Sequence, residues 1–482
     1  MSLWDRKITS DPLLLAKDQN VDVLIIGAGI TGLTTAYYLK DYPSVCVVDA
    51  SRIGCGVTVN TTAKVTYFQE RIHTKICNAT NEKNAEIYLK SQRQAISYLK
   101  EIIEKEKIDC DFKKTPSYVF ANTEKEVSPL KTEVEFLKEQ GVFVQEKELP
   151  EKITTYSSYM VEDTYTFHPL KYLEGLYQVL QKKKIPVYEN SRILNIEEKD
   201  GKYYCKSSYG CIQANKVVLA CHYPFFLFPF LLPVKSSVEK SYIVVSKVEK
   251  DGGYSCISSS SPTYSCRFYQ DQESCYQISL SESHNIAFHQ DDEKHFRRVK
   301  DIFGLDDKNV VTEYSNVDIL TPDHMPYIGK IKHNMYIGVG YNTWGMTNGV
   351  LAGKIISDMI LYKQNEFVKV FDPLRKNIAR YAKLPYYLFG QTKSYFGAKI
   401  SKNKVWYPNT ITFRRKDGKS LGIYIDSKKV KHIVYNTCPH LGCSLIFNNQ
   451  EKTWDCPCHS SRFSVDGECI KGPSTKDIKY ES

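Results

Sequence analysis

The sequence lacks any apolar run long enough to cross a lipid bilayer, although it has 482 residues. Its N-terminal stretch, MSLWDRKITSDPLLLAKDQN, contains neither a long apolar segment nor a cleavage site of small residues, so no secretory signal is indicated. Internal repeats and low-complexity segments are absent as well. With 42% hydrophobic and 25% charged residues, the composition is typical of a soluble globular protein. We therefore expect no membrane span and a cytoplasmic location.

Basic segments interleaved with aromatic residues are also missing, which argues against nucleic-acid binding. The net charge of +10 is nevertheless unevenly distributed. Residues 395–482 contain 15 Lys and Arg against 8 Asp and Glu, whereas the remaining residues contain 50 against 47. A basic C-terminal part can dock an acidic partner, but so small an excess is more typical of a solvated surface. We expect no nucleic-acid partner.

A disulfide framework is not expected either, although the sequence contains 15 cysteines. In a cytoplasmic chain of this length, most cysteines are free thiols or metal ligands. Eleven of them are scattered, and the other four lie in two short segments near the C-terminal end, CPHLGC and CPCH. Each of these segments also contains a histidine, so together they are candidates for a metal site.

The N-terminal part contains a glycine-rich motif between two predicted buried strands. The strand at 21–26 (VDVLII) is followed by the motif GAGITG (27–32), which opens a helix, and a second strand (45–50) contains Asp49. In such a motif the first glycine makes a tight turn, the second lets the backbone approach a pyrophosphate, and the third allows close helix–strand packing. The helix N terminus favours phosphates, and Asp49 can accept hydrogen bonds from a ribose. The pattern predicts a dinucleotide site but does not distinguish NAD from FAD.

Further stretches resemble the amino-acid oxidase family of FAD-dependent oxidoreductases, which includes glycine and sarcosine oxidases. The resemblance is carried by five stretches, namely GCGVTVNTTAKVT (54–66), SRILNI (191–196), KVVLACHYP (216–224), NVDILTPDHMPYIG (316–329) and MYIGVGYNTWGMTNGVLAGKIISDMI (335–360). It covers roughly residues 20–375 and implies FAD as the cofactor, with a glycine-rich loop leading into a helix whose N terminus points at the flavin ring. The cofactor-binding residues that it implies are Gly27, Ala28, Gly29, Ile30, Thr31, Gly32, Asp49, Ala50, Ser51, Thr61, Thr62, Ala63, Ile193, Ala220, Gly340, Gly345, Met346 and Thr347.

The two cysteine- and histidine-containing segments have the spacing of a mixed-ligand iron–sulfur site. Cys438-x-His440 is followed, after 15 intervening residues, by Cys456-x-x-His459. Zinc sites use the same ligand types, but they usually separate paired cysteines by two to four residues, so the C-x-H spacing disfavours zinc. Two thiolates on one iron and two imidazoles on the other are the ligands of a Rieske [2Fe–2S] cluster.

Both segments also resemble Rieske domains almost letter for letter. This resemblance implies a disulfide between Cys443 and Cys458 and a third, cluster-covering loop at 472–474 (GPS). Hydrogen bonds to the sulfur atoms raise the reduction potential of such clusters. Ser461 stands at the position of a serine donor, but Phe463 stands where high-potential members have tyrosine. We therefore predict a midpoint potential in the middle of the Rieske range.

Rieske domains also occur in ring-hydroxylating oxygenases, which bind a mononuclear iron through two histidines and a carboxylate. His284 and His289, with Asp291 and Asp292 nearby, offer such ligands. The surrounding sequence is not helical, so a polar strand and turn is the favoured interpretation. His168 is followed by a proline and is expected to begin a helix or to face the substrate cavity rather than to bind metal.

These assignments predict an α/β FAD-binding (Rossmann-like) domain, an α+β substrate domain and a small all-β Rieske domain. The oxidoreductase part would span 20–385, divided into FAD-binding segments (about 20–75, 155–225 and 320–385) and substrate segments (about 76–154 and 226–319), and would be followed by a linker (386–403) and the Rieske domain (404–482). Helices are expected at 81–108 and at 129–141.

The combination predicts a flavin-dependent enzyme that passes electrons on singly. FAD accepts two electrons as a hydride, whereas the cluster takes one electron at a time. The resemblance implies a small amine or amino-acid-like substrate, and the cluster implies an external one-electron carrier. Reverse electron flow from a carrier to a substrate, and electron transfer or redox sensing without an organic substrate, are the alternatives. No catalytic base is evident, and Lys64 and His222 are the weak candidates.

Overall fold

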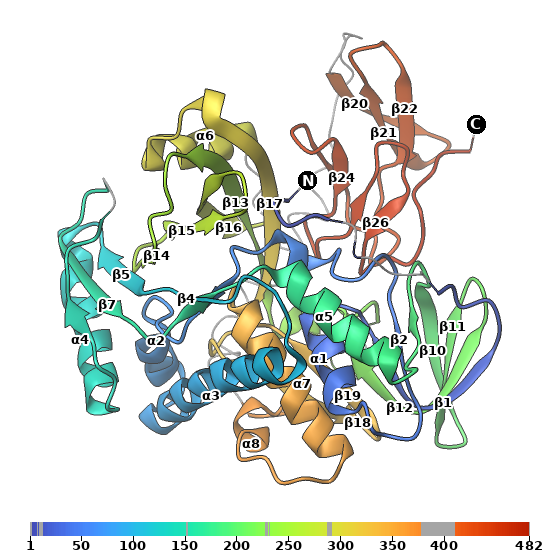
Figure 1. The fold of residues 1–482 in the computed structure, drawn as a ribbon. Coiled ribbons are helices and arrows are strands. Elements are labelled where there is room, and N and C mark those ends of the chain that lie inside the picture. Colours follow the sequence, from blue (N-terminus) through green and yellow to red (C-terminus); the bar gives the residue numbers. More distant parts are fainter. Residues whose placement is uncertain are drawn as a thin grey trace.

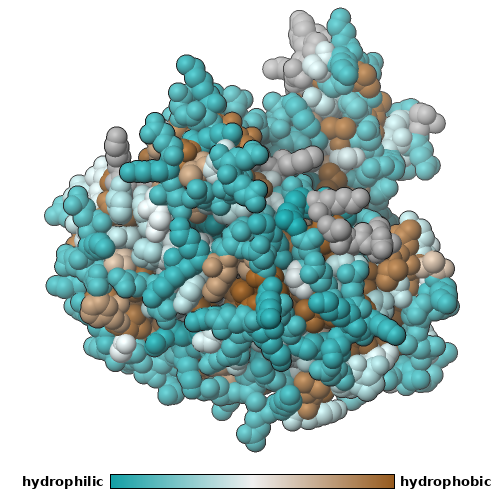
Figure 2. All heavy atoms as spheres, viewed as in Figure 1, coloured by the Kyte–Doolittle hydropathy of each residue, from teal (hydrophilic) through white to brown (hydrophobic). Residues whose placement is uncertain are grey.

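The structure is a computed structural model that describes residues 2–6, 8, 13–150, 153–226, 230, 232–286, 292–376 and 410–481. Two eight-stranded sheets form the larger part, and two smaller sheets form a C-terminal part that lies at the upper right in Figure 1. On the face shown in Figure 2, hydrophilic residues predominate and hydrophobic residues form separate patches. No helix within these described ranges is long and apolar enough to cross a membrane.

The first sheet is built around the N-terminal strand, as the sequence predicts. Strand β1 (Gln19–Ile26) runs parallel to β2 (Val45–Val48) and to β12 (Cys211–Leu219), which is in turn parallel to β19 (Met335–Val339). The apolar ends of β1 and β2 are completely buried because helices cover the sheet. The remaining strands of this sheet are β9 (Val187–Tyr188), β10 (Ile193–Lys199), β11 (Lys202–Ser207) and β18 (Tyr327–Lys332).

Four helices pack against one another beside the first sheet. The packed pairs are α1 (Ile30–Tyr38) with α7 (Gly345–Ile360), α3 (Glu82–Glu106) with α7, and α5 (Pro169–Lys182) with α1. The helix predicted at 81–108 is confirmed as α3, and the Asn81 side chain caps it by accepting the N–H of Asn84. The helix predicted at 129–141 is wrong at its start, because α4 (Glu124–Glu139) begins before Pro129 with acidic residues in its first turn.

The second sheet has the strand order β17-β13-β16-β15-β14-β5-β7-β6. Its members are β5 (Ser117–Ala121), β6 (Gln145–Glu146), β7 (Ser157–Val161), β13 (Ser237–Val248), β14 (Ser255–Ser258), β15 (Ser265–Gln270), β16 (Cys275–Asn285) and β17 (Val310–Leu320). A three-stranded sheet links the two large ones and contains β3 (Lys64–Val65), β4 (Lys113–Lys114) and β8 (Tyr165–Thr166). The short helices are α2 (Ile72–Ala79), α6 (Asp292–Phe303), α8 (Val368–Phe371), η1 (Val57–Asn60), η2 (Leu232–Val234) and η3 (Asp307–Asn309).

The C-terminal part contains only strands within its described residues, which confirms the all-β prediction. Its first sheet contains β20 (Thr410–Lys416), β21 (Lys419–Ile425) and β22 (Lys431–Tyr435), and its second contains β23 (Ile446–Asn448), β24 (Thr453–Asp455), β25 (Arg462–Phe463) and β26 (Cys469–Lys471). Trp454 is fully buried between the sheets and contacts Phe413 and Phe447. The predicted linker at 386–403 lies outside the described residues.

This all-β part docks on both large sheets through polar contacts. Arg192 donates to the carbonyl oxygens of Ser474 and Cys469, at 3.3 and 3.2 Å. Beside β17, Arg462 donates to the Ser315 hydroxyl at 3.2 Å, and Gln450 donates to the Glu313 carboxylate at 2.8 Å. The two cysteine-rich loops therefore face the interior of the molecule.

Candidate functional site

The glycine-rich turn between β1 and α1 requires glycine at two positions. Gly27 has a φ of +113°, and a Cβ atom there would lie 2.4 Å from the carbonyl oxygen of Ala220. A Cβ atom at Gly32 would lie 1.8 Å from the carbonyl oxygen of Gly27. The tight turn and the close helix–strand packing leave the N terminus of α1 open toward a cavity.

Asp49 holds this turn from the end of β2. Its Oδ2 accepts the N–H of Ala28 at 2.7 Å, and its Oδ1 accepts the N–H of Ser51 at 2.8 Å. Burial raises the pKa of the Asp49 carboxyl to about 6. Because a carboxylate oxygen can accept more than one hydrogen bond, Asp49 can also accept a hydroxyl from a ligand in the cavity that it lines.

The cavity has a volume of about 530 Å³ and extends from the glycine-rich turn to the C-terminal loops. A volume of this size is typical of a cofactor or small-molecule site. The residues predicted to bind the cofactor that line it are Gly27, Gly29, Ile30, Thr31, Asp49, Ala50, Ser51, Thr61, Ile193, Ala220, Gly340, Gly345 and Met346.

The other residues predicted to bind the cofactor lie behind the wall. Ala28 and Gly32 shape the turn, as described above. The carbonyl oxygens of Thr62 and Ala63 accept hydrogen bonds from Arg267, and the Thr347 hydroxyl bonds to Gln92. These residues support the wall and do not line the cavity.

The N terminus of α7 opens into the same cavity. Trp344 precedes this 16-residue helix without a side-chain cap, and Gly345 and Met346 line the cavity wall. Tyr341 also lines it, and its hydroxyl is 2.8 Å from that of Thr31 on α1. Two helix N termini thus offer backbone N–H groups and positive dipole ends to one negatively charged ligand.

Only one of the two candidate catalytic residues lines the cavity. Lys64 points away from the cavity, because its Nζ donates to the carbonyl oxygen of Cys256 at 3.3 Å and contacts the Ser265 hydroxyl. Burial lowers its pKa to about 8. His222 lines the cavity, and its Nε2 has no hydrogen-bond partner in the described part of the chain. Burial lowers the pKa of His222 to about 3.

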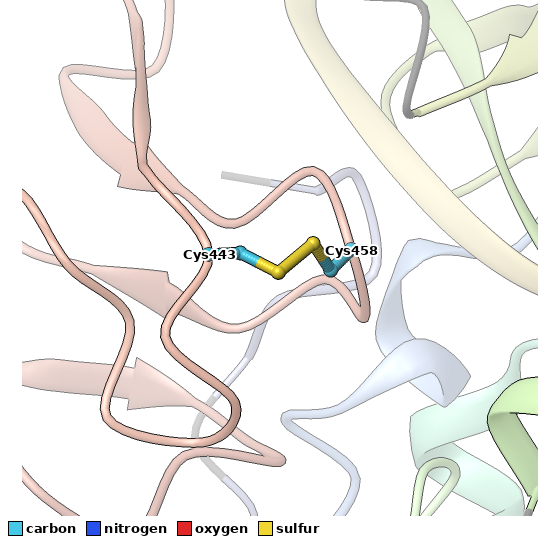
Figure 3. The surroundings of a disulfide bond; sticks show 2 residues. All are labelled: Cys443 and Cys458. Atoms are coloured by element: carbon cyan, nitrogen blue, oxygen red, sulfur yellow. A yellow bond between two sulfur atoms is a disulfide. The ribbon is translucent and has the colours of Figure 1, made fainter. Parts of the chain in front are cut away.

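At the far end of the cavity, two loops of the all-β part are joined by a disulfide. The first loop connects β22 to β23, and the second connects β24 to β25. The disulfide between Cys443 and Cys458 ties them together, as Figure 3 shows. The backbone N–H of Cys438 also donates to the carbonyl oxygen of Cys443 at 2.8 Å. These contacts bring the predicted metal ligands of both loops to one place.

The four predicted ligands present buried donor atoms. Cys438, Cys456 and His459 are each no more than 2% exposed, and the His440 and His459 rings lie 5.0 Å apart. All four imidazole nitrogens are buried and have no hydrogen-bond partner among the described residues. Buried polar atoms normally find a partner, so these nitrogens fit the ligand atoms of a metal centre.

Of these four groups, the two histidines are in the protonation state that metal binding requires. The hydrogen bond between the two thiols lowers the pKa of Cys438 to about 7 and raises the pKa of Cys456. Burial lowers the pKa of His440 to about 4 and that of His459 to about 3, so both imidazoles are neutral at neutral pH. Two thiolates and two neutral imidazoles are the donor set of a Rieske cluster, so both thiols would lose their protons when the cluster binds.

The surroundings of the sulfur atoms match the predicted hydrogen-bonding pattern. The Ser461 hydroxyl hydrogen-bonds to Cys438 and accepts the N–H of Ser474 at 2.9 Å. Phe463 is fully buried on β25 and has no donor group.

The alternative mononuclear iron site is not assembled by the described residues. His284 stacks on Tyr242 and His295, with ring centroids 5.7 and 4.7 Å apart, and Asp292 binds Lys240 at 2.8 Å. His289 and Asp291 lie outside the described residues. His168 caps α5 by accepting the N–H of Lys171 at 3.3 Å, which confirms the prediction that it begins a helix.

Several cavity residues were not found by sequence reasoning. Thr58 binds the N–H of Ile30 at 3.3 Å, and Tyr223, Asp318 and Lys471 also line the cavity. Tyr223 lies next to Ala220 in a segment that had already been singled out. Nothing in the sequence indicated that Asp318 and Lys471 share one cavity, because 153 positions separate them.

Comparison with known proteins identifies both parts of the chain. The profile of the FAD dependent oxidoreductase family matches residues 22–359. The chain belongs to this family. The profile of the Rieske [2Fe-2S] domain matches residues 398–480. This member of the family therefore binds FAD through its first part and a [2Fe–2S] cluster through its second, and it is an oxidoreductase.

Individual proteins resemble the whole chain or its first part. A protein of Bacillus subtilis (strain 168), YhfW, which carries a provisional name as a Rieske 2Fe-2S iron-sulfur protein, is 28% identical over 482 residues and covers 96% of this chain and 94% of its own length. Glycine oxidase from Geobacillus kaustophilus has a similar fold, with a TM-score of 0.61, 16% identity and coverage of 74% of this chain and 99% of its own. L-proline dehydrogenase from P. horikoshii gives a TM-score of 0.60 at 16% identity, with coverage of 74% of this chain and 98% of its own.

Proposed function

We propose that the protein oxidises a small amine or amino-acid-like molecule at FAD and relays the electrons singly through the [2Fe–2S] cluster to an external carrier. The observation that carries this proposal is that the FAD-binding turn and the cluster-binding loop line one cavity. Gly27 and Gly29 lie at one end of it, and Cys456 and Pro457 lie at the other. Bound FAD supplies hydride acceptance, and the cluster supplies one-electron transfer.

The chain's own groups support the oxidation of a substrate at this site. The N-terminal N–H groups of α7 would stabilise negative charge on a ligand beside Gly345 and Met346. His222 is a poor base because its pKa is lowered to about 3. Its proposed role is therefore to position a ligand through a hydrogen bond from or to its imidazole.

Two opposite charges in the cavity support the proposed substrate class. Asp318 on β17 and Lys471 on β26 both line the cavity and attract each other electrostatically, but within the described residues neither side chain makes a direct hydrogen bond or a close ion pair. Charged groups that are removed from bulk water need partners. An ammonium group would pair with Asp318, and the carboxylate of an amino acid would pair with Lys471. The family neighbours glycine oxidase and L-proline dehydrogenase, by their names, act on such molecules.

Anaerobic reduction by candidate substrates tests the proposal. The purified holoprotein is mixed with a panel of amines and amino acids, while the visible absorbance of oxidised flavin is followed and the EPR signal of the reduced cluster is recorded. Flavin bleaching followed by the cluster signal supports the proposal. Reduction of both cofactors by a reduced carrier, with no bleaching by any member of the panel, would instead support reverse electron flow or a sensing role.

A further inference from the structure

The segment after β12 carries an aromatic residue from the cofactor cavity to the cluster loops. Ala220, Cys221, His222 and Tyr223 all line the cavity. His222 has a φ of +55°, which is uncommon for a residue other than glycine. This turn directs Tyr223 away from the first sheet and toward the C-terminal part.

Tyr223 packs directly against both predicted histidine ligands. Its ring centroid is 5.1 Å from that of His459, in a tilted arrangement, and 6.3 Å from that of His440, edge to face. These separations are typical of aromatic contacts. Tyr223 is 4% exposed and belongs to an apolar cluster that includes Val317 and Ile319, so its ring is held firmly in place.

The phenol group of Tyr223 remains neutral and has no structural partner. Burial raises its pKa far above the ordinary value. Its hydroxyl is buried and makes no hydrogen bond to the described residues. A structural tyrosine usually satisfies its hydroxyl when buried, so the phenol oxygen is not what holds the residue here. The ring is therefore the part of Tyr223 that makes the contacts with the two histidines.

We propose that Tyr223 is a positioning residue for electron transfer, because its ring is the packed contact between the flavin cavity and the histidine side of the cluster. This inference rests on the proposed function, since it assumes transfer between the two cofactors. The rate of electron transfer falls steeply as the gap between donor and acceptor grows, and packed atoms couple the two better than a void does. One electron crosses the contact per event: reduced flavin loses it and the oxidised cluster gains it. No bond forms or breaks, and the external carrier reoxidises the cluster between the two events.

The test uses the holoprotein without any substrate, so it does not depend on the substrate class. The flavin is reduced by a light pulse with EDTA as the electron donor, and the appearance of the reduced cluster is followed by absorbance and by freeze-quench EPR. The variants are Tyr223→Phe, which keeps the ring, and Tyr223→Leu, which removes it. Tyr336→Leu on β19 is the control for the loss of a buried aromatic outside the cavity. Cofactor content and the cluster midpoint potential are measured for each variant.

We expect Tyr223→Phe and Tyr336→Leu to transfer at the wild-type rate. Tyr223→Leu should be slower by roughly tenfold or more, since a packed contact becomes a gap, while its cofactor content and cluster midpoint stay unchanged. Equal rates in Tyr223→Leu and the wild type would overturn the inference and leave the proposed function intact. Absence of flavin-to-cluster transfer in the wild type would overturn both.

A loss of rate accompanied by a shifted midpoint or by cofactor loss would show a merely structural role and would also overturn the inference. Should Tyr223→Leu fail to fold, Tyr223→Met replaces it, because methionine fills an irregular space without a ring. For this variant too, a slower transfer rate with both cofactors intact would support the inference, and an unchanged transfer rate would overturn it.

Discussion

Single residues decide which ligands the shared cavity can hold, and Asp318 and Lys471 are the clearest cases. Both line the cavity, where each lies near the opposite charge of the other, and neither side chain has a direct hydrogen bond within the described residues. Burial raises the pKa of Asp318 to about 6 and lowers the pKa of Lys471 to about 8. Each group is therefore less stable in its charged form than in water, and a ligand of opposite charge would restore that form.

Replacing Asp318 by asparagine should weaken the binding of amine substrates. The lost charge-assisted hydrogen bond is worth about 2 kcal/mol, so KM should rise roughly thirtyfold. In the wild type, only the carboxylate attracts an ammonium group, so KM should fall as the pH rises through about 6. Asp318→Asn should lack this inflection. Steady-state kinetics from pH 5 to 8 with an anaerobic dye assay measure both effects.

Lys471→Met is the matched variant of this test. It should raise KM for amino acids more than KM for simple amines, because it removes the partner of the carboxylate and also removes the positive charge that lowers the pKa of Asp318. Asp301→Asn on the exposed surface of α6 should change neither KM. An unchanged KM in Asp318→Asn over the whole pH range would contradict the assignment of Asp318 to the substrate.

The reduction potential of the cluster should respond to a single substitution at Phe463. This side chain is fully buried beside the cluster loops and cannot donate a hydrogen bond. Phe463→Tyr would add a donor, and one net hydrogen bond of about 1 kcal/mol corresponds to roughly 40 mV in a one-electron couple. We expect the midpoint to rise by that order in an EPR-monitored redox titration. Phe413→Tyr is the control, because Phe413 contacts Trp454 in the same domain, and it should leave the midpoint unchanged. A lower midpoint potential in Phe463→Tyr would refute the argument.

At the scale of structural elements, motifs made of consecutive residues could be predicted from the sequence, whereas contacts between distant residues could not. The β1–turn–α1 unit and the two cysteine-rich loops were predicted because each motif lies within a few consecutive residues, where turn geometry and ligand spacing are fixed by the backbone. The predicted start of α4 was wrong, because the helix begins at Glu124 and includes Pro129, where the predicted segment began. The contacts of Tyr223 with His459 and of Arg192 with Ser474 could not be predicted, since over 200 positions separate each pair and only the docked domains bring them together.

One partly buried arginine connects β25 to β17. Arg462 binds Glu451 and Asp455, each at 2.9 Å, and also reaches Ser315. Burial alone would raise the pKa of both carboxyls, but the guanidinium keeps them below their usual values. Arg462→Ala would leave two buried carboxylates without this partner. It should lower the free energy of unfolding by about 3 kcal/mol.

Thermal unfolding followed by the visible absorbance of the cluster measures this loss. The exposed Arg415→Ala on β20 is the control and should leave the unfolding transition in place. A transition in Arg462→Ala that coincides with that of the wild type would show that the connection between β25 and β17 does not depend on this side chain.

At the scale of the whole molecule, the proposed electron relay would have an internal step between the two docked parts and an external step to the carrier. The internal step crosses a buried contact, where His459 is 2% exposed and faces Tyr223. The external step would take place on the outer surface, and the described residues 410–481 contain 12 Lys and Arg against 8 Asp and Glu. An anionic acceptor would be attracted to that surface before it reaches the cluster.

A higher salt concentration should therefore slow the external step and leave the rate of the internal step unchanged. Exposed charges are screened over a distance that shrinks from about 14 Å at about 0.05 M to about 4 Å at about 0.5 M salt, whereas buried contacts are screened much less. We expect reduction of ferricyanide by the photoreduced holoprotein to slow by on the order of tenfold over this range. The flavin-to-cluster rate in the same samples should stay constant. A neutral quinone acceptor is the control, since its rate should not depend on salt. If the internal rate fell in parallel with the ferricyanide rate, the domains would be held together mainly by exposed charges, and the buried contact between Tyr223 and the histidine ligands would not be the working arrangement.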